Sequence, residues 1–230
     1  MLQPASEAEL AEAIRATAAA LRIVGGGTRP VGRPVTGTAL SMRGLSGIRL
    51  YEPGALTLVA GAGTPLSEVE AALSAAGQRL PFEPMDHRGL FAASNAAITG
   101  GTGAPTIGGV VAANASGPRR VQLGACRDSL IGVRFVDGAG TVIRNGGRVM
   151  KNVTGYDLVK MMAGSWGTLG VLSEVAFKLL PRPKTEATLV FEGLEDTRAV
   201  AAMAAALGSP YEVTGAAHLP DGRTILRQEG

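Results

Sequence analysis

Glycine-rich segments suited to phosphate binding recur along this chain. The first, Gly25-Gly26-Gly27-Thr28-Arg29, follows a short predicted strand. Backbone amides that no side chain covers can approach an anion closely, so this loop is a candidate phosphate-binding nest. A simple surface turn is the alternative interpretation of the same residues.

A second segment, Gly61-Ala62-Gly63, lies between a predicted strand and a predicted helix, which is where a Rossmann dinucleotide loop is found. Glu83 follows at about the twenty-residue distance expected of a ribose-binding acid. However, Leu66 occupies the third glycine position and Pro84 directly follows Glu83. These two departures disfavour a nicotinamide site of the Rossmann type.

A third segment, residues 106–117, combines Gly108, Gly109 and Gly117 with alanine, serine and threonine. We expect an extended stretch against which the diphosphate of a ligand can lie, with room and amide donors. A buried glycine-rich strand crossing is the alternative. A fourth segment, residues 164–171, is weak evidence alone.

The helices and strands that would position these loops are predicted from the spacing of apolar residues and from the capping and turn residues at their ends. Ser6 and Glu9 form a capping box for a helix that carries Leu10 and Ile14. The further predicted strands are 21–24, 56–60, 130–136, 141–144, 171–180 and 185–191, with short ones near 216 and 224; the further helices are 64–77, 156–163 and 196–207. The half up to Leu80 is predicted to be a small α/β unit, and 181–183 to be a stiff linker.

Composition excludes several classes of protein. Glycine accounts for 33 of 230 residues, about twice the ~7% of an average protein, without the period of collagen. A formal charge of +3 and 4% aromatic residues give no basic groove or stacking surface for nucleic acid. With 46% hydrophobic residues, the chain has a globular composition.

Cysteine use and the N-terminus favour a reducing compartment. Cys126 is the only cysteine, so neither an intrachain disulfide nor a cysteine-based metal or iron–sulfur site is expected. Residues 1–10 are polar and lack the pattern of a signal peptide. We therefore expect a cytoplasmic protein without a transmembrane segment.

Taken together, the order of these motifs resembles the FAD-binding domain of the vanillyl-alcohol-oxidase/p-cresol-methylhydroxylase (PCMH) superfamily. Within it, the chain resembles the FAD-binding subunits of bacterial glycolate oxidases. The resemblance covers about residues 1–227. It rests on the glycine loops above and on Gly124-Ala125-Cys126-Arg127-Asp128, Gly117-Pro118-Arg119-Arg120, the segment 149–158, Gly167-Thr168-Leu169-Gly170 and the segment 178–183.

This resemblance implies an α+β fold in two parts. Residues 1–181 would form a PCMH-type FAD-binding domain of two α/β subdomains. Residues 182–230 would begin a ferredoxin-like cap domain, whose β-α-β-β order stops at Gly230 before the unit is complete. We expect a truncated second domain.

The resemblance also implies a non-covalently bound FAD, because Gly27 stands where relatives with covalent FAD often carry a histidine. The two glycine loops would hold the pyrophosphate through backbone amides. Other residues would follow the flavin and ribityl chain or supply backbone contacts. The implied cofactor-binding set is Gly25, Gly26, Gly27, Thr28, Arg29, Pro105, Thr106, Ile107, Gly108, Gly109, Ala112, Ser116, Arg127, Asp128, Gly170 and Val171.

The implied chemistry is oxidation of a 2-hydroxy acid such as glycolate to the 2-oxo acid, with FAD as the hydride acceptor. This chemistry needs a base near the hydroxyl and a cation for the carboxylate. His87, His218, Arg119 and Arg120 are the candidates. A structural or surface role is favoured for both histidines, and contact with a partner or solvent for both arginines. No catalytic residue is assigned, and no metal site is expected.

The implied partners are a larger FAD-containing catalytic subunit and an iron–sulfur subunit. Contact with the inner membrane would be peripheral and only through that complex. Two alternatives stay open. The chain would be a self-sufficient flavin oxidase of the same superfamily, or a truncated assembly subunit without catalysis.

Overall fold

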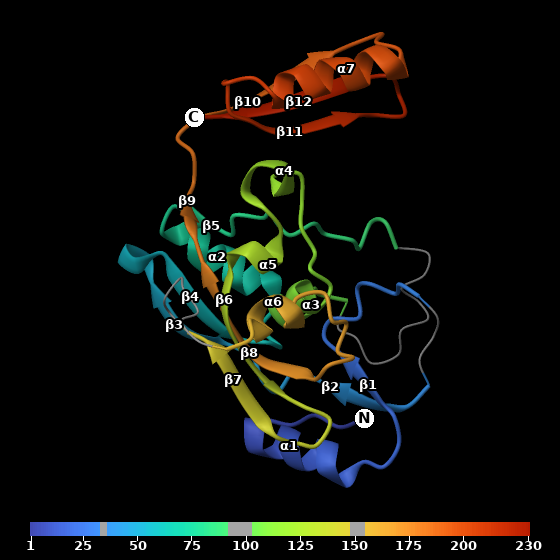
Figure 1. The fold of residues 1–230 in the computed structure, drawn as a ribbon, viewed down its shortest axis with the longest axis vertical. Helices are drawn as coiled ribbons and strands as arrows, with labels where there is room; N and C mark the ends of the chain where they lie inside the picture. Colours follow the sequence, from blue (N-terminus) through green and yellow to red (C-terminus); the bar gives the residue numbers. More distant parts are fainter. Residues whose placement is uncertain (33–35, 92–102, 148–154) are drawn as a thin grey trace.

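The computed structural model describes residues 1–32, 36–91, 103–147 and 155–230. Residues 149–154 of the motif 149–158 lie outside this description. The chain up to Pro181 builds one mixed body, and the residues after it build a small sheet with one helix at the end remote from the N-terminus (Figure 1).

The centre of the larger body is a five-stranded sheet of order β3-β4-β8-β6-β7, in which all neighbours are antiparallel. Its middle strand, β8, is buried along most of its length, as its apolar sequence predicts. A 3₁₀ turn, η1 (Pro53–Ala55), joins β3 to β4. The strands are β3 (Ile48–Glu52), β4 (Thr57–Gly61), β6 (Leu130–Val136), β7 (Val142–Gly146) and β8 (Val171–Lys178).

The main hydrophobic core joins β4, β6 and β8 to four helices. Phe82 and Phe177 are the largest fully buried side chains in it. A short pair of strands, β5 (Gln78–Arg79) and β9 (Leu180–Pro181), lies beside them, and α4 (Arg120–Leu123) lies nearer the C-terminal sheet. The four helices are α2 (Leu66–Ala75), α3 (Ile107–Ala112), α5 (Cys126–Ser129) and α6 (Leu158–Met162).

A second core lies at the N-terminal end of the molecule. There α1 (Glu7–Ala16) packs against β1 (Leu21–Val24) and β2 (Thr38–Ser41), which are parallel, and against the ends of β6 and β8. Ser6 caps α1 by accepting a hydrogen bond from the Glu9 amide at 3.2 Å, as predicted.

Glu7 joins α1 to the central sheet. Its carboxylate accepts hydrogen bonds from Arg134 Nε on β6 (3.0 Å) and from Ser173 Oγ on β8 (2.6 Å). The hydrogen bond from Arg134 holds the pKa of Glu7 below its ordinary value, and the bond from Ser173 adds to this against the opposing effect of burial. Glu7 therefore stabilises the fold in its ionised form.

We expect Glu7→Gln to lower the free energy of unfolding at pH 7 by about 1.5–3 kcal/mol, the range for hydrogen bonds to a charged group. Because the pKa of Glu7 is depressed in the folded state, its contribution is present above the ordinary carboxyl pKa and is lost as pH falls through the folded-state pKa. Urea unfolding at pH 7 and pH 3 would measure both effects. Glu12→Gln, at an exposed pair with Arg15, is the control and should change little; equal effects of the two substitutions would contradict the assignment.

The chain after Pro181 forms a three-stranded antiparallel sheet of order β10-β12-β11, with α7 (Asp196–Leu207) against it (Figure 1). Its strands are β10 (Glu186–Phe191), β11 (Val213–His218) and β12 (Thr224–Glu229). The β-α-β-β order is the predicted one. All six residues of the edge strand β10 are exposed.

Three expectations about local structure were wrong. The stretch containing Gly108 and Gly109 is not extended but helical (α3), because Thr106 caps it by accepting from the Gly109 amide at 3.3 Å. The half up to Leu80 is not a separate unit, because β4 pairs with β8. The N-caps predicted for α2 and α7, Thr64 and Asp196, are each one residue away from the observed N-caps, Pro65 and Glu195.

Within the described ranges, none of the helices has the length and apolar character needed to cross a membrane.

Candidate cofactor site

Two loops meet at one end of the central sheet, and their contact leaves no room for side chains. A Cβ atom at Gly26 would lie 1.6 Å from the carbonyl oxygen of Ala104, and one at Gly25 would lie 2.5 Å from Thr106 Oγ1. Gly27 has a φ of 69°, in the left-handed region. The first loop therefore requires glycine for close packing against the second.

The first loop supplies backbone donors. Within the described residues, the amides of Gly26, Gly27 and Thr28 donate no hydrogen bond to another protein group. Consecutive amides of this kind form a concave anion site when they face a ligand. The loop thus has the donors that a diphosphate needs.

The second loop contributes a surface rather than donors. The amides of Ile107 and Gly108 already donate to Thr64 and Ala62, both at 2.9 Å. A Cβ atom at Gly108 would lie 2.6 Å from Ala62 Cβ, whereas one at Gly109 would meet only Thr106 Oγ1, at 3.1 Å. Gly108 therefore brings α3 close to β4, and Gly109 leaves its side of α3 open to a ligand.

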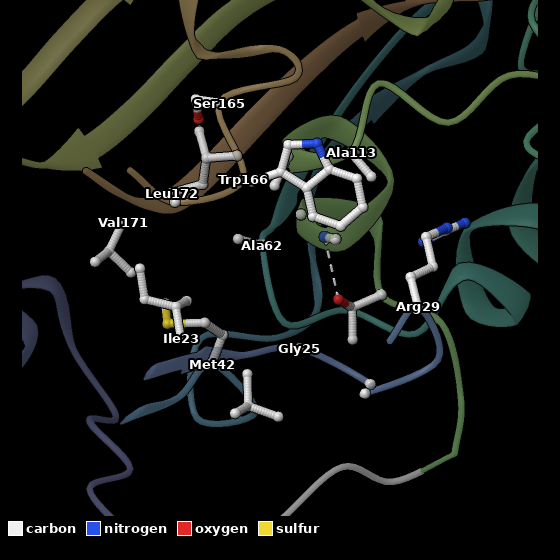
Figure 2. A pocket seen from close by; sticks show the side chains of 18 of the residues that line it. Ile23, Gly25, Arg29, Met42, Ala62, Ala113, Ser165, Trp166, Val171 and Leu172 are labelled. Carbon is white, nitrogen blue, oxygen red and sulfur yellow. Dashed lines mark hydrogen bonds between the residues drawn. The ribbon is translucent and has the colours of Figure 1, made fainter. Parts of the chain in front are cut away.

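These loops surround a cavity of about 220 Å³ (Figure 2). This volume lies below the ~300–1,000 Å³ of pockets that enclose a drug-sized ligand, so the cavity fits part of a dinucleotide. It brings together most of the predicted set: Gly25, Gly26, Gly27, Thr28, Arg29, Thr106, Gly108, Gly109, Ala112, Gly170 and Val171.

The other predicted residues lie outside this cavity. Pro105 accepts a hydrogen bond from the Leu66 amide, and Ile107 is fully buried in the core. The remaining three shape the turn after α3. The Ser116 hydroxyl accepts from the Cys126 amide (2.9 Å), the Asp128 carboxylate accepts from the Ala125 amide (2.8 Å), and the Arg127 amide donates to Asn114 (3.0 Å).

Several residues line the cavity that the predicted cofactor-binding set does not contain, although some of them lie in the glycine-rich segments 61–63 and 164–171. They come from β1, from the turn after β2, from the ends of β4 and α3, and from β8 and the turn before it, so only the tertiary fold brings them together. Glycines flagged the two loops, but nothing local marks an apolar wall. The missed residues are Arg22, Ile23, Val24, Met42, Ala62, Ala113, Ser165, Trp166, Gly167 and Leu172.

Arg29 is the cation that the first loop brings to the cavity. Its Nε donates to His87 Nδ1 at 2.7 Å, and its Nη2 donates to the Met85 carbonyl at 3.2 Å. Burial lowers the pKa of His87, and the positive charge of Arg29 lowers it further. His87 is thus an uncharged acceptor that holds the guanidinium, a structural role of the kind expected for it. His218 bonds to Thr224 Oγ1, 2.9 Å away, in the C-terminal sheet.

Arg119 lies in a charge cluster that connects the two bodies, so the expectation of contact with a partner or solvent was wrong for it. Its side chain is 7% exposed and pairs with Glu229 of β12. Arg79 also reaches Glu229, at 2.6 Å, and Arg227 reaches Glu83, at 2.6 Å. Residues 110 positions apart form the first pair, which explains why sequence spacing did not reveal it. The five charged side chains thus connect the larger body to the C-terminal sheet.

The site is built for binding rather than for acid–base chemistry. Cys126 is buried, and burial raises the pKa of its thiol, so the thiolate is disfavoured. No group of three or more histidine, cysteine, aspartate or glutamate side chains suited to a metal occurs in the described ranges. Free amides, a half-buried arginine and a bare helix surface fit the diphosphate and adjoining groups of FAD.

Comparison with known proteins decides the family. Residues 1–105 and 91–146 match the model of the family described as FAD binding domain. The chain belongs to this family. Its cofactor is therefore FAD, and the fit of the cavity agrees with this.

Two relatives show which members of the family this chain is similar to. The chain is 48% identical over 159 residues to the glycolate oxidase subunit GlcE of Escherichia coli (strain K12), covering 69% of this chain and 41% of that protein. It is 45% identical over 85 residues to the glycolate oxidase subunit GlcD of Bacillus subtilis (strain 168), covering 37% of this chain and 18% of that protein. The chain thus spans less than half the length of these relatives.

The fold matches solved structures over almost its whole length. An alkyldihydroxyacetonephosphate synthase superimposes with a TM-score of 0.74 over 99% of this chain and 46% of the other, at 18% identity. This likeness confirms the predicted α+β fold.

Proposed function

We propose that this chain is an FAD-binding subunit of a glycolate oxidase complex, which oxidises a 2-hydroxy acid to the 2-oxo acid. The observation that carries the proposal is the 48% identity to the GlcE subunit over 69% of the chain. The oxidation removes the hydroxyl proton and a hydride equivalent from the α-carbon, and bound FAD supplies the hydride acceptor.

The chain's own residues would bind and orient the cofactor. The amides of Gly26, Gly27 and Thr28 would donate to the diphosphate, and Arg29, held by His87, would neutralise part of its charge. Gly109 and Ala112 would let the cofactor lie against α3. Ser116, Arg127 and Asp128 would shape the turn beyond the cavity and act on the flavin end indirectly.

The catalytic base and the carboxylate-binding cation would come largely from elsewhere. Arg119 is engaged with Glu229, and His87 with Arg29, so neither is free for substrate. We therefore propose that turnover requires a larger FAD-containing subunit, with an iron–sulfur subunit as electron carrier. Residues 182–230 would be the beginning of a second, cap domain. The complex would be cytoplasmic and peripheral to the inner membrane.

An absorption spectrum with added FAD, followed by anaerobic glycolate, tests the proposal. We expect flavin bands near ~450 nm with resolved shoulders, no bleaching by glycolate when the chain is alone, and bleaching when the larger subunit is added. Bleaching by the chain alone would instead support a self-sufficient oxidase. Bound flavin that neither glycolate nor D-lactate reduces, even with the partner, would overturn the proposed reaction.

A further inference from the structure

Trp166 occupies a backbone conformation that tryptophan rarely adopts. The turn from Ser165 to Thr168 is closed by a hydrogen bond from the Thr168 amide to the Ser165 carbonyl at 2.9 Å. Both central residues have positive φ, 53° at Trp166 and 78° at Gly167. Such turns favour glycine, asparagine or aspartate, because a bulky side chain in this region is strained.

The turn is fixed on both sides by the elements that carry the cofactor loops. The amides of Gly164 and Trp166 donate to Val111 (3.0 Å) and Ala112 (2.9 Å) at the end of α3. A Cβ atom at Gly167 would lie 2.7 Å from Ile23 Cδ1 on β1. Trp166 is therefore held in place by contacts on both sides of the cavity.

The indole lines the cavity and is only partly covered by protein. Trp166 is 51% exposed and lies at the cavity wall opposite Gly25 and Met42 in the close view (Figure 2). A half-exposed aromatic side chain that is held in a strained backbone conformation at a cavity wall is expected where a ligand covers it.

We propose that Trp166 stacks on the adenine ring of FAD. The cavity is too small for the whole dinucleotide, so it accommodates one end of the molecule together with the diphosphate. The flavin end must stay open to substrate, and the adenine is therefore the ring enclosed here. The inference rests on FAD as the cofactor and is independent of the identity of the substrate.

The adenine assignment predicts a selective response to fragments of the cofactor. Trp166 is the only tryptophan in the chain, so its fluorescence reports this position alone. We expect ADP, which lacks flavin, to change the intensity or wavelength of the emission. FMN, which lacks adenine, should neither bind with comparable affinity nor compete with ADP. A response to FMN without a response to ADP would assign the flavin ring to this cavity and overturn the proposal.

Substitution separates stacking from a merely structural role. Trp166→Asn should weaken binding of ADP and FAD by about 5- to 150-fold, the equivalent of ~1–3 kcal/mol for stacking of one base on an aromatic side chain. The same change should raise the melting temperature of the protein without cofactor, because asparagine tolerates positive φ. Trp166→Phe should restore most of the affinity.

Leu169→Ala is the matched control, since Leu169 is 47% exposed in the same segment and does not line the cavity. Calorimetric titration with ADP and thermal unfolding without ligand measure both properties for every variant. Unchanged ADP affinity in Trp166→Asn would overturn the proposal. A fall in both affinity and melting temperature would show a structural role for Trp166 and would overturn it as well. Binding of FAD by the wild-type chain is read independently from the flavin spectrum.

Discussion

Gly26→Ala is expected to lower the affinity for FAD by at least about 100-fold and to give a colourless purified protein. The added Cβ atom would lie 1.6 Å from the carbonyl oxygen and 2.5 Å from the carbonyl carbon of Ala104. Both are backbone atoms, so no side-chain rotation relieves the clash and the two loops must separate. The cofactor would be held by the first loop against α3. When the two loops move apart, the amides of the first loop no longer lie at the short distances that charge-assisted hydrogen bonds to the diphosphate require.

A second substitution distinguishes loss of the site from loss of the fold. Gly109→Ala adds a methyl group on the cavity side of α3, where the nearest protein atom is Thr106 Oγ1 at 3.1 Å. Alanine is also favoured over glycine in a helix by about 1 kcal/mol. The tight contact with Thr106 Oγ1, which caps α3, opposes this gain. Gly109→Ala should therefore change the stability of the apoprotein by no more than about 1 kcal/mol and still weaken FAD binding.

Gly54→Ala is the control for both changes, because nothing lies within 4 Å of its added Cβ atom. Titration of each apoprotein with FAD, followed by flavin fluorescence, gives the affinities, and circular dichroism verifies the fold. Wild-type affinity in both Gly26→Ala and Gly109→Ala would mean that the two loops do not hold the cofactor.

Sequence predicted the elements whose signals are local. Ser6 supplies the cap of α1, and Asp137-Gly138 marks the turn between β6 and β7. The apolar residues along β6 and β8 predict both strands, because the side chains of both strands face the core. The glycines of the first loop were also detected, since close approach of two backbones demands them.

Sequence failed where tertiary contacts decide. Two adjacent glycines argue against a helix, yet α3 forms because Thr106 caps it and Gly108 packs on Ala62. Trp166 was missed because its turn reaches the cavity only through contacts with α3 and β1. Arg119 was misjudged because its partner, Glu229, lies at the other end of the chain and on another sheet.

The largest expected loss of stability follows Phe177→Ala. Phe177 is fully buried in β8, and its ring centroid lies 5.7 Å from that of Phe82. Truncation removes the burial of a large side chain and leaves a cavity in the core, which destabilises by about 3–5 kcal/mol. This is a large part of the ~5–15 kcal/mol by which a domain is stable. Urea unfolding would measure it, with Phe191→Ala on the exposed edge strand β10 as the control, for which a change below about 1 kcal/mol is expected.

The effect of FAD on the melting temperature distinguishes Phe177→Ala from Gly26→Ala. Neither Phe177 nor Phe82 lines the cavity, so the folded fraction of Phe177→Ala should bind FAD with nearly wild-type affinity. A ligand that binds only the folded state adds a stabilisation set by its concentration and Kd. Saturating FAD should thus raise the melting temperatures of the wild type and Phe177→Ala by similar amounts and leave that of Gly26→Ala unchanged. The Gly117 amide donates a hydrogen bond to the Phe82 carbonyl at 2.8 Å, which joins the core to the segment that follows α3. If FAD failed to stabilise Phe177→Ala, packing of the core around Phe82 would itself be needed to form the cofactor site.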